Sequence, residues 1–350
     1  MALRISEYSR RRAIGSGFAA AAGLAWGRRA AAQALPRIGY GCGSIDVIFT
    51  VAYVTLKQGY FRDAGLDVDY LNSQSGPRTK QMLAAGQILV GSSGASDPMT
   101  VTVAGKPATL IFGLDRKITY ANMLVHKDDF DSGRFRVLKD LSGQRIGVTQ
   151  LQSATWLMAV YLTERAGVKD AEFRGLGDLS TMLGALKSKQ VGATVATMAM
   201  MQQGVQQGFA APIFDVTNDA AWTEAFGGDV PGLGCYVMQD TIARRPAELQ
   251  AFVSAMVRGQ DFINASSAET ITDLIHEDYL NGFSKEAVRN TVALYKEKVF
   301  TRDNLIGKAE YERLLAIMGG GRQFTDDEVK RVPYEQAVDM RFVRKARNLA

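Results

Sequence analysis

Leu56-Lys57-Gln58-Gly59-Tyr60-Phe61-Arg62-Asp63-Ala64-Gly65-Leu66-Asp67-Val68 is the stretch that decides the fold, because a helix ends in it and a strand begins there. Apolar residues keep helical spacing from about Ile45 to Lys57, and Gly59 follows at the position where a left-handed residue commonly ends a helix. Apolar and acidic residues then alternate over residues 66–70. This alternation predicts a strand with one wet face, or one near a sheet edge.

Strands alternate with helices on both sides of this stretch. A first series has predicted strands at residues 37–41, 66–70, 88–90 and 108–112, with helices between them. A second series has strands at 145–148, 171–175 and 191–195, with helices at 156–165 and 181–188. After Gly234 a strand at 236–238 precedes further helices, the first of which begins at Pro246. The alternation predicts parallel sheets covered by helices, so the expected fold class is α/β.

Four loops at the carboxyl ends of predicted strands are rich in Gly and Ser: residues 43–46, 74–76, 92–96 and 152–156. Ligands of open parallel sheets bind beyond these strand ends, where the next helices present free N–H groups and positive dipole ends. We therefore predict a ligand-binding cleft that includes Ser44, Asp46, Ser75, Ser93, Ser96, Ser153, Thr155, Trp156 and Arg116. Each serine has an alternative role, which is to cap the helix that follows it.

The acidic, aromatic and basic candidates also have a second interpretation. Asp46, like Asp97, either pairs a cationic group of the ligand or caps a helix. Trp156 either stacks on a flat ligand or belongs to the core. Arg116 and Lys117 either reach a carboxylate or sulfonate, or form a solvated basic pair. The sequence leaves these alternatives open.

The first 34 residues have the features of an export signal. Ser9-Arg10-Arg11-Arg12 precedes a mildly apolar run, and Ala32-Gln33-Ala34 is a small-x-small cleavage site. Paired arginines after a serine favour the twin-arginine route over the general secretory one, with cleavage near Ala34. An arginine-rich amphipathic or mitochondrial leader is the alternative. Export would place the mature protein in the periplasm.

Charge and composition restrict the function of the remaining chain. Six of the 41 basic and one of the 36 acidic residues lie in residues 1–34, which leaves 35 of each sign. The balance gives no reason to expect a nucleic acid partner. We expect no cofactor and no metal, since the only histidines are His126 and His276. Cys42 and Cys235 are expected to be separate thiols. No apolar run after the leader reaches membrane-spanning length, so we expect a soluble mature protein.

The stretch quoted first also carries a family resemblance. Gly59 to Val68 follows the pattern G-[FY]-F-x-x-x-G-L-x-V of the nitrate, sulfonate, taurine and thiamine-precursor binding proteins, called NMT1-like. Supporting matches cover residues 83–87, 104–107, 140–148 and 245–253. Leu89 and Gly192 depart from the family, which often has Asp at these positions. The departures leave the expected fold intact and the identity of the ligand open.

The resemblance implies a type II periplasmic-binding-protein fold, with two α/β lobes joined by two crossing strands. Lobe 1 would comprise residues 35–118 plus 239–350, and lobe 2 residues 119–238, with crossings near 120–125 and 235–238. It also implies a monomeric receptor that captures a small organic solute and delivers it to an ABC transporter permease. An anion such as a sulfonate or carboxylate is the leading ligand class, and an aromatic or a neutral pyrimidine is the alternative. The alternatives are an enzyme of thiamine-pyrimidine biosynthesis with the same fold, and a ligand-sensing module for a membrane receptor.

Overall fold

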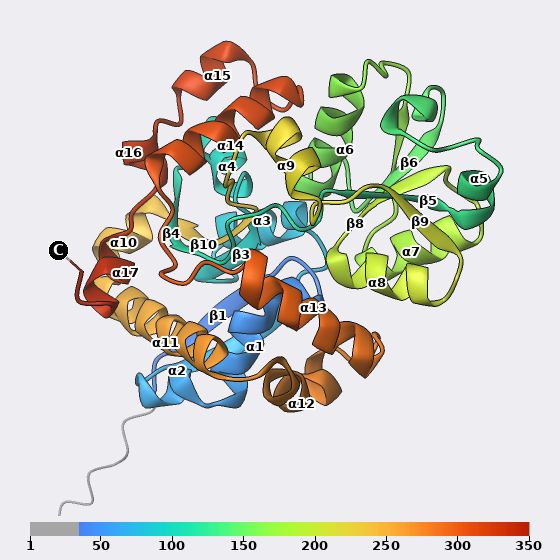
Figure 1. Cartoon of the computed structure of the whole chain (residues 1–350). Helices are drawn as coiled ribbons and strands as arrows, with labels where there is room; N and C mark the ends of the chain where they lie inside the picture. The colour runs from blue at the N-terminus through green and yellow to red at the C-terminus, as the bar shows by residue number, and fades with distance from the viewer. Residues whose placement is uncertain (1–34, 350) are drawn as a thin grey trace, which may run out of the picture. The chain divides into compact units, whose positions relative to one another are not determined.

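The computed structural model describes residues 35–349, so the predicted leader lies outside the described residues. This part of the chain is a mixed α/β structure with two five-stranded sheets (Figure 1). The first sheet has the order β2-β1-β3-β10-β4, and its strands are β1 Arg37–Cys42, β2 Asp67–Asn72, β3 Val90–Gly94, β4 Ala108–Gly113 and β10 Leu233–Met238. The second has the order β7-β6-β8-β5-β9, with β5 Asn122–His126, β6 Arg145–Val148, β7 Glu172–Gly175, β8 Ala193–Ala196 and β9 Ala210–Phe214.

The stretch 56–68 forms the predicted junction between a helix and an edge strand. Helix α1 ends at Lys57, and Gly59 has the left-handed φ of 71° expected beyond a helix end. A short helix that the sequence did not predict, α2 Tyr60–Asp63, comes before β2. β2 lies at the edge of the first sheet and pairs only with β1 among the described strands, which agrees with its alternating polar residues.

Each sheet contains one antiparallel strand in the fourth position. β10 runs antiparallel to β3 and β4, and β5 runs antiparallel to β8 and β9. The chain enters the second sheet directly after β4 and returns to the first sheet in β10, so it crosses between the sheets twice. The crossing segments are residues 114–121 and 227–232.

The two crossing segments are bonded to each other. The Leu114 N–H donates to the Leu233 carbonyl, and the Val230 N–H donates to the Arg116 carbonyl. The buried Asp115 carboxylate accepts the N–H groups of Gly232 and Leu233. Burial raises the pKa of Asp115 to about 8, although these two N–H groups act in the opposite direction. The crossings therefore form one hydrogen-bonded connection.

The α-helices that alternate with the strands are α1 Thr50–Lys57, α3 Gly76–Ala84, α4 Asp97–Val103, α5 Lys127–Asp131, α6 Ala154–Arg165, α7 Leu179–Lys187, α8 Met198–Gln206 and α9 Asp219–Phe226; the 3-10 helices are Val47–Phe49 and Leu138–Leu141. The later helices are α10 Gln239–Arg244, α11 Pro246–Ala265, α12 Ala268–Tyr279, α13 Lys285–Lys298, α14 Lys308–Gly320, α15 Asp326–Lys330, α16 Tyr334–Ala337 and α17 Arg341–Ala346. Among the described residues, no helix combines the length and the apolar character needed to cross a membrane.

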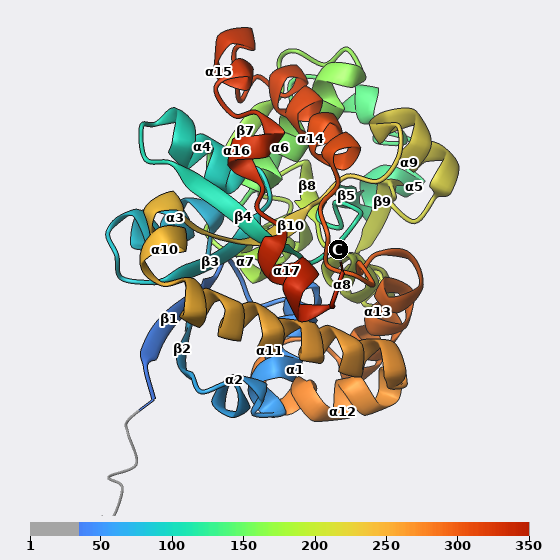
Figure 2. The same ribbon diagram turned by 90° about the vertical axis from the view of Figure 1, so that its left-hand side faces the viewer.

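The later helices pack on both sheets. α11 lies along α1 and α2, as Figure 2 shows, and Gly259 permits this approach because a Cβ atom there would lie 2.0 Å from Thr55 Oγ1. α13 contacts α8, and α14 contacts α6, so helices that follow the first sheet reach helices of the second. Cys42 and Cys235 are buried in the core as free thiols, which confirms their predicted separation. Burial raises the pKa of Cys235 to about 12.

The structure differs from the sequence prediction in several strands. Residues 92–94 belong to β3, where a loop was predicted, because β10 extends the pairing of this segment to Gly94. β5 was expected only as a crossing, and β9 was not predicted. β10 belongs to the first sheet, whereas the predicted division placed residues up to 238 in lobe 2. The difference arises because β10 pairs with β3 and β4, which lie more than 100 residues earlier in the chain.

Candidate functional site

A cavity of about 50 Å³ lies where the strand ends of the two sheets face each other. From the first sheet and its helices it is lined by Gly43, Ser44, Ile48, Phe49, Ser75, Gly76, Ser93, Gly94 and Asp97. From the second it is lined by Thr149, Ser153, Ala154, Thr155, Leu179 and Thr197, and the crossing region adds Tyr120 and Leu233. By the volume that one water needs, roughly 10–15 Å³ on the same measure, the cavity accepts a small chemical group.

Glycines at two strand ends make room for the side chains of the first wall. A Cβ atom added at Gly43 would lie 3.0 Å from the Cβ of Ser93, and one at Gly76 would lie 2.4 Å from Asp97 Oδ2. Ser93 is itself fixed, because its hydroxyl donates to Asp97 and lies 2.8 Å from the Tyr236 hydroxyl. The Oγ of Ser75, at the start of α3, is buried and has no hydrogen-bond partner.

The second wall is a connected set of hydroxyl groups at the start of α6. The Oγ of Ser153 accepts the N–H of Trp156 at 3.2 Å and lies 2.8 Å from the Thr155 Oγ1. Thr155 Oγ1 also accepts the Thr149 N–H at 3.0 Å. Because each hydroxyl holds the next, their positions are set before any solute binds.

Two direct contacts join the walls. The Thr197 hydroxyl, at the start of α8, donates to Asp46 Oδ2 at 2.6 Å, and the other oxygen of Asp46 accepts the Ile48 N–H. Gly94 faces Ala154 so closely that a Cβ atom added at Gly94 would lie 2.5 Å from the Cβ of Ala154. The first contact is polar and fully buried, and the second requires a residue without a side chain.

Burial raises the pKa of Asp46 to about 6, because a carboxylate loses hydration there. The hydrogen bonds from Thr197 and from the backbone N–H groups of Ile48 and Val47 act in the opposite direction. Asp46 therefore changes charge in the mildly acidic range. The change alters the acceptor of the hydrogen bond that Thr197 donates across the cavity.

Asp97 is the one residue with a carboxylate or a basic group among the lining residues described above. Its side chain is fully buried, and Lys80 Nζ lies 3.2 Å from its Oδ1. That pair lacks hydrogen-bond geometry, since Oδ1 accepts no hydrogen bond. Lys80 instead donates to Thr100 Oγ1 at 2.9 Å and does not line the cavity. Eight lining residues carry hydroxyl groups: Ser44, Ser75, Ser93, Tyr120, Thr149, Ser153, Thr155 and Thr197.

The structure brings most of the predicted site residues together. Ser44, Ser75, Ser93, Ser153 and Thr155 line the cavity. Whether they bind a ligand stays a prediction.

Four predicted residues lie elsewhere. Asp46 lies behind the wall and joins it to Thr197. Ser96 is buried outside the lining, and Trp156 packs edge-on against Phe173 with ring centroids 6.5 Å apart. Trp156 thus points away from the cavity, because its side of α6 covers the second sheet. Arg116, the fourth residue, lies at the crossing segments.

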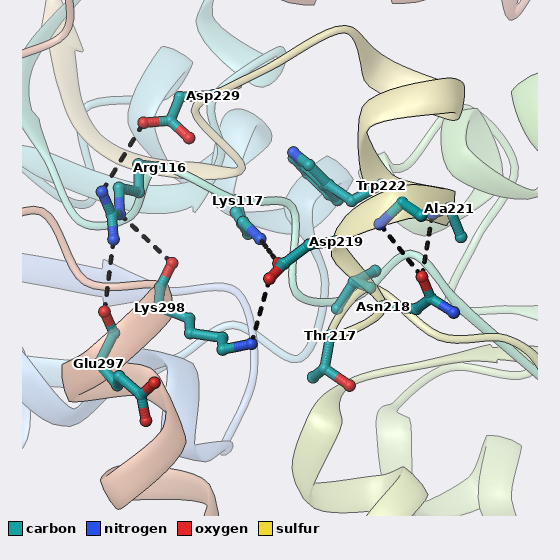
Figure 3. Close-up of polar contacts among 12 residues, drawn as sticks. Arg116, Lys117, Thr217, Asn218, Asp219, Ala221, Trp222, Asp229, Glu297 and Lys298 are labelled. Carbon is teal, nitrogen blue, oxygen red and sulfur yellow. Dashed lines mark hydrogen bonds and ion pairs between the residues drawn. The ribbon is translucent and has the colours of Figure 1, made fainter.

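Arg116 is bound to other parts of the protein, as Figure 3 shows. Its guanidinium donates to the carbonyls of Glu297 and Lys298 at the end of α13 and lies 3.9 Å from the Asp229 carboxylate. Unpaired carbonyls and the negative dipole end of a helix attract a cation, which explains the placement. Lys117 forms an ion pair with Asp219. The two basic residues Arg116 and Lys117 therefore neither line the cavity nor lie free in solvent.

The capping alternative is correct for some residues and wrong for others. Ser153 and Asp46 do cap the helices that follow them. Ser75 and Ser96 stand at N-cap positions but make no capping hydrogen bond. Asp97 is the first residue of α4 and its carboxylate instead meets Ser93 and Lys80.

Among the hydroxyl-bearing lining residues, three were not predicted: Tyr120, Thr149 and Thr197. Thr197 follows β8 and begins α8, so the strand-end argument applied to it as well. Thr149 directly follows β6 in the same way. Tyr120 lies in a crossing segment and donates to the Gly232 carbonyl, and no local pattern indicates that position.

A larger hollow of about 620 Å³ adjoins the cavity and shares Ser44 and Leu179 with it. Its walls come from α7 and α8 of the second sheet and from residues 278–283, which include the last turn of α12 and the loop after it. Amide side chains are frequent in the lining: Asn72, Gln74, Gln203, Gln207 and Asn281. The small cavity therefore continues into a wider, polar space.

Comparison with known proteins agrees with this architecture. Residues 47–270 match the family described as NMT1/THI5 like, and the chain belongs to that family. YtlA of Bacillus subtilis (strain 168), described as a candidate binding protein, is 22% identical over 306 residues, which cover 86% of each chain.

Solved structures show the same fold. A Bordetella bronchiseptica RB50 protein has a TM-score of 0.80 at 22% identity, over 89% of this chain and 97% of the other. The alkanesulfonate-binding protein SsuA from Xanthomonas axonopodis pv. citri, bound to MOPS, has a TM-score of 0.68 at 16% identity, over 88% and 98%. The periplasmic nitrate-binding protein NrtA from Synechocystis has a TM-score of 0.69 at 11% identity, and the match covers 90% of this chain and 89% of the other. The fold is therefore that of the two-lobed periplasmic binding proteins, as predicted.

Proposed function

We propose that this protein is a solute-binding receptor that captures a small organic solute between its two lobes and delivers it to the permease of an ABC transporter. The observation that carries the proposal is the cavity, whose lining comes from the strand ends of both sheets. Only two crossing segments connect the sheets, and their mutual hydrogen bonds make them a natural hinge. The family and the descriptions of its relatives support the same function.

Closure supplies the binding mechanism. When the sheets come together, a solute exchanges water for hydroxyl groups already fixed by their neighbours, which limits the entropy that binding costs. A micromolar dissociation constant requires roughly −8 kcal/mol, which a few such hydrogen bonds and some buried apolar area can provide. The contact of Thr197 with Asp46 forms only when the walls meet, so it favours the closed arrangement.

The place of action follows from the same proposal. The features of residues 1–34 indicate export by the twin-arginine route, and the structural relative NrtA is described as periplasmic. We propose that the mature protein works in the periplasm as a monomer, where the loaded closed form is what the permease recognises. No feature of the described residues specifically supports the enzyme alternative or the sensor alternative.

The ligand class is the finer part of the proposal. The leading ligand class is an organic anion, and the relatives described as alkanesulfonate-binding and nitrate-binding are named for an organic and an inorganic anion, respectively. In this chain an anion would depend on backbone N–H groups and hydroxyls, because none of the lining residues, all within 35–349, is Lys, Arg or His.

A thermal-shift screen of the chain without residues 1–34 tests the proposal. Sulfonates, carboxylates, amines and neutral amides are compared at constant ionic strength. A true ligand raises the melting temperature in proportion to the logarithm of its concentration, since it binds only the folded state. A ligand that also reduces the radius of gyration in X-ray scattering supports capture by closure. If no class raises the melting temperature and no solute accompanies the purified protein, the proposed function is wrong.

A further inference from the structure

We propose that Asp97 faces the solute, and that the solute presents a nitrogen donor, best a protonated amine, to this carboxylate. The inference rests on the proposed function and specifies its ligand: a small organic cation in preference to a sulfonate or carboxylate. The position of Asp97 at the first wall, its partners and the chemistry of the rest of the lining carry the argument.

The position of Asp97 decides what α3 can bind. The start of this nine-residue helix faces the cavity through Ser75 and Gly76. A helix start attracts an anion, but a Cβ atom at Gly76 would lie 2.4 Å from Asp97 Oδ2, so the carboxylate is already at that place. The protein thus supplies its own anion where an anionic ligand would be held.

The partners of Asp97 leave acceptor capacity at the cavity. Ser93 donates to Oδ2, and Oδ1 has the Lys80 ammonium 3.2 Å away as an ion-pair partner that does not line the cavity. Lys80 balances the charge from outside the lining and gives its hydrogen bond to Thr100. Ser75, 3% exposed, adds a buried polar atom without a partner. Buried polar atoms are rarely left without partners, so the Ser75 Oγ indicates a polar group that arrives with the ligand beside Asp97.

Electrostatics favour a cation over an oxyanion at this position. An oxyanion here would face the oxygens of Asp97 with no cation in the lining, since Lys80 does not line the cavity, whereas an ammonium gains a charge-assisted hydrogen bond. Ile48, Phe49, Leu179 and Leu233 give the cavity apolar walls. These walls suit a short aliphatic or flat body behind the charged nitrogen. The expected class is therefore a small primary amine or amidine with an apolar body.

The structural alternative is that the Asp97–Lys80 pair only holds α4 to α3. Two variants separate these roles. Asp97→Asn removes the charge that would meet the ligand, and the matched variant Lys80→Gln breaks the same ion pair while it keeps the carboxylate. A ligand-facing Asp97 predicts different effects on binding, and a merely structural pair predicts equal ones.

The experiment is calorimetric titration of the wild-type chain with n-butylamine, butyramide, butyrate and butane-1-sulfonate at fixed ionic strength and pH 7. We expect the amine to bind at least tenfold more tightly than the sulfonate. Asp97→Asn should weaken amine binding at least tenfold and leave or improve sulfonate binding, while Lys80→Gln retains the preference for the amine.

Tighter binding of the sulfonate by the wild type overturns this inference and leaves the proposed function in place. Equal loss of amine binding in Asp97→Asn and Lys80→Gln, at equal melting temperatures, also overturns it. The wild-type comparison decides the matter even if a variant does not fold. Binding of none of the four probes, together with no bound solute in mass spectra of the purified protein, overturns the inference and the proposed function together.

Discussion

The crossing region and the cavity use charged side chains in opposite ways. At the crossings, Arg116 meets carbonyls at the end of α13, and the Asp219 carboxylate lies between Lys117 and Lys298 (Figure 3). At the cavity the walls consist of hydroxyls, apolar groups and the single carboxylate of Asp97. Basic residues near the crossings therefore serve the connection between the lobes, while the solute meets hydroxyls, apolar groups and one carboxylate.

Each region also holds a buried carboxylate, and the largest expected effect is their pH dependence. Burial raises the pKa of Asp46 to about 6 and that of Asp115 to about 8. A raised carboxyl pKa gives stability that is full below the unfolded value, near 4, and is lost as pH rises through the folded value. Asp46 alone should lower the free energy of unfolding by about 2 kcal/mol between pH 4 and pH 6.

Urea denaturation between pH 4 and pH 8 measures this effect. Asp46→Asn should reduce the fall between pH 4 and pH 6 by about 2 kcal/mol, and Asp115→Asn should reduce the fall over the whole range from pH 4 to pH 8, because the pKa of Asp115 is about 8. A wild-type stability that increases from pH 4 to pH 6, with Asp46→Asn showing the same curve, contradicts the assignment.

The contact between Gly94 and Ala154 gives the next largest effect. A Cβ atom in Gly94→Ala would lie 2.5 Å from Ala154, and separation of the walls relieves the clash, so the closed form alone is penalised. Overpacking of about 1–3 kcal/mol corresponds to roughly 5- to 150-fold weaker solute binding. Calorimetry gives the affinity, and X-ray scattering should show a larger radius of gyration with solute present.

Gly319→Ala in α14 is the matched control, because no atom lies within 4 Å of the added Cβ and the residue lines neither the cavity nor the larger hollow. It should leave affinity unchanged and stabilise the helix by up to about 1 kcal/mol. Equal affinities for Gly94→Ala and the wild type would show that the two walls do not need to meet.

Ser75 and Ser96 provide a smaller and sharper comparison. Both have a buried Oγ without a partner, but only Ser75 lines the cavity. Ser75→Ala should leave the melting temperature nearly unchanged and weaken solute binding about 2- to 10-fold, the value of one hydrogen bond. Ser96→Ala should change neither quantity, and a similar loss of affinity in both variants would remove Ser75 from the site.

Arg116 tests the crossing region with the smallest expected effect. Arg116→Ala removes two hydrogen bonds to the end of α13, and its guanidinium is half-exposed. We expect a loss of about 0.3–1 kcal/mol in stability that decreases at high salt, and a change in affinity below about twofold. A tenfold loss of affinity would mean that Arg116 meets the solute after all.

The sequence predicted elements whose signals are local. Gly59 marked the end of α1, and the alternation in residues 66–70 marked an edge strand. Helix α11 begins and ends where predicted, because Pro246 fits only the first turn of a helix. β5, β9 and the extension of β3 were not predicted, since antiparallel partners far along the chain define them.

The same distinction applies to the site. The rule that ligands meet strand ends identified Ser44, Ser75, Ser93, Ser153 and Thr155 as cavity-lining residues. It failed for Trp156 and Arg116, because the direction of a side chain depends on tertiary packing. From the sequence, Asp97 was a candidate to pair a cationic group of the ligand or to cap a helix. Its proximity to Gly76 appears only when α3 and α4 are packed together.

The central claim is that both lobes hold one solute in the cavity between them. A crystal structure of the protein with its co-purified or tightest-binding solute tests it most directly. We predict a solute that contacts Asp97 or Ser75 on one side and Ser153 or Thr155 on the other. A solute bound by one lobe alone, or beside Arg116 at the crossing segments, would contradict the account.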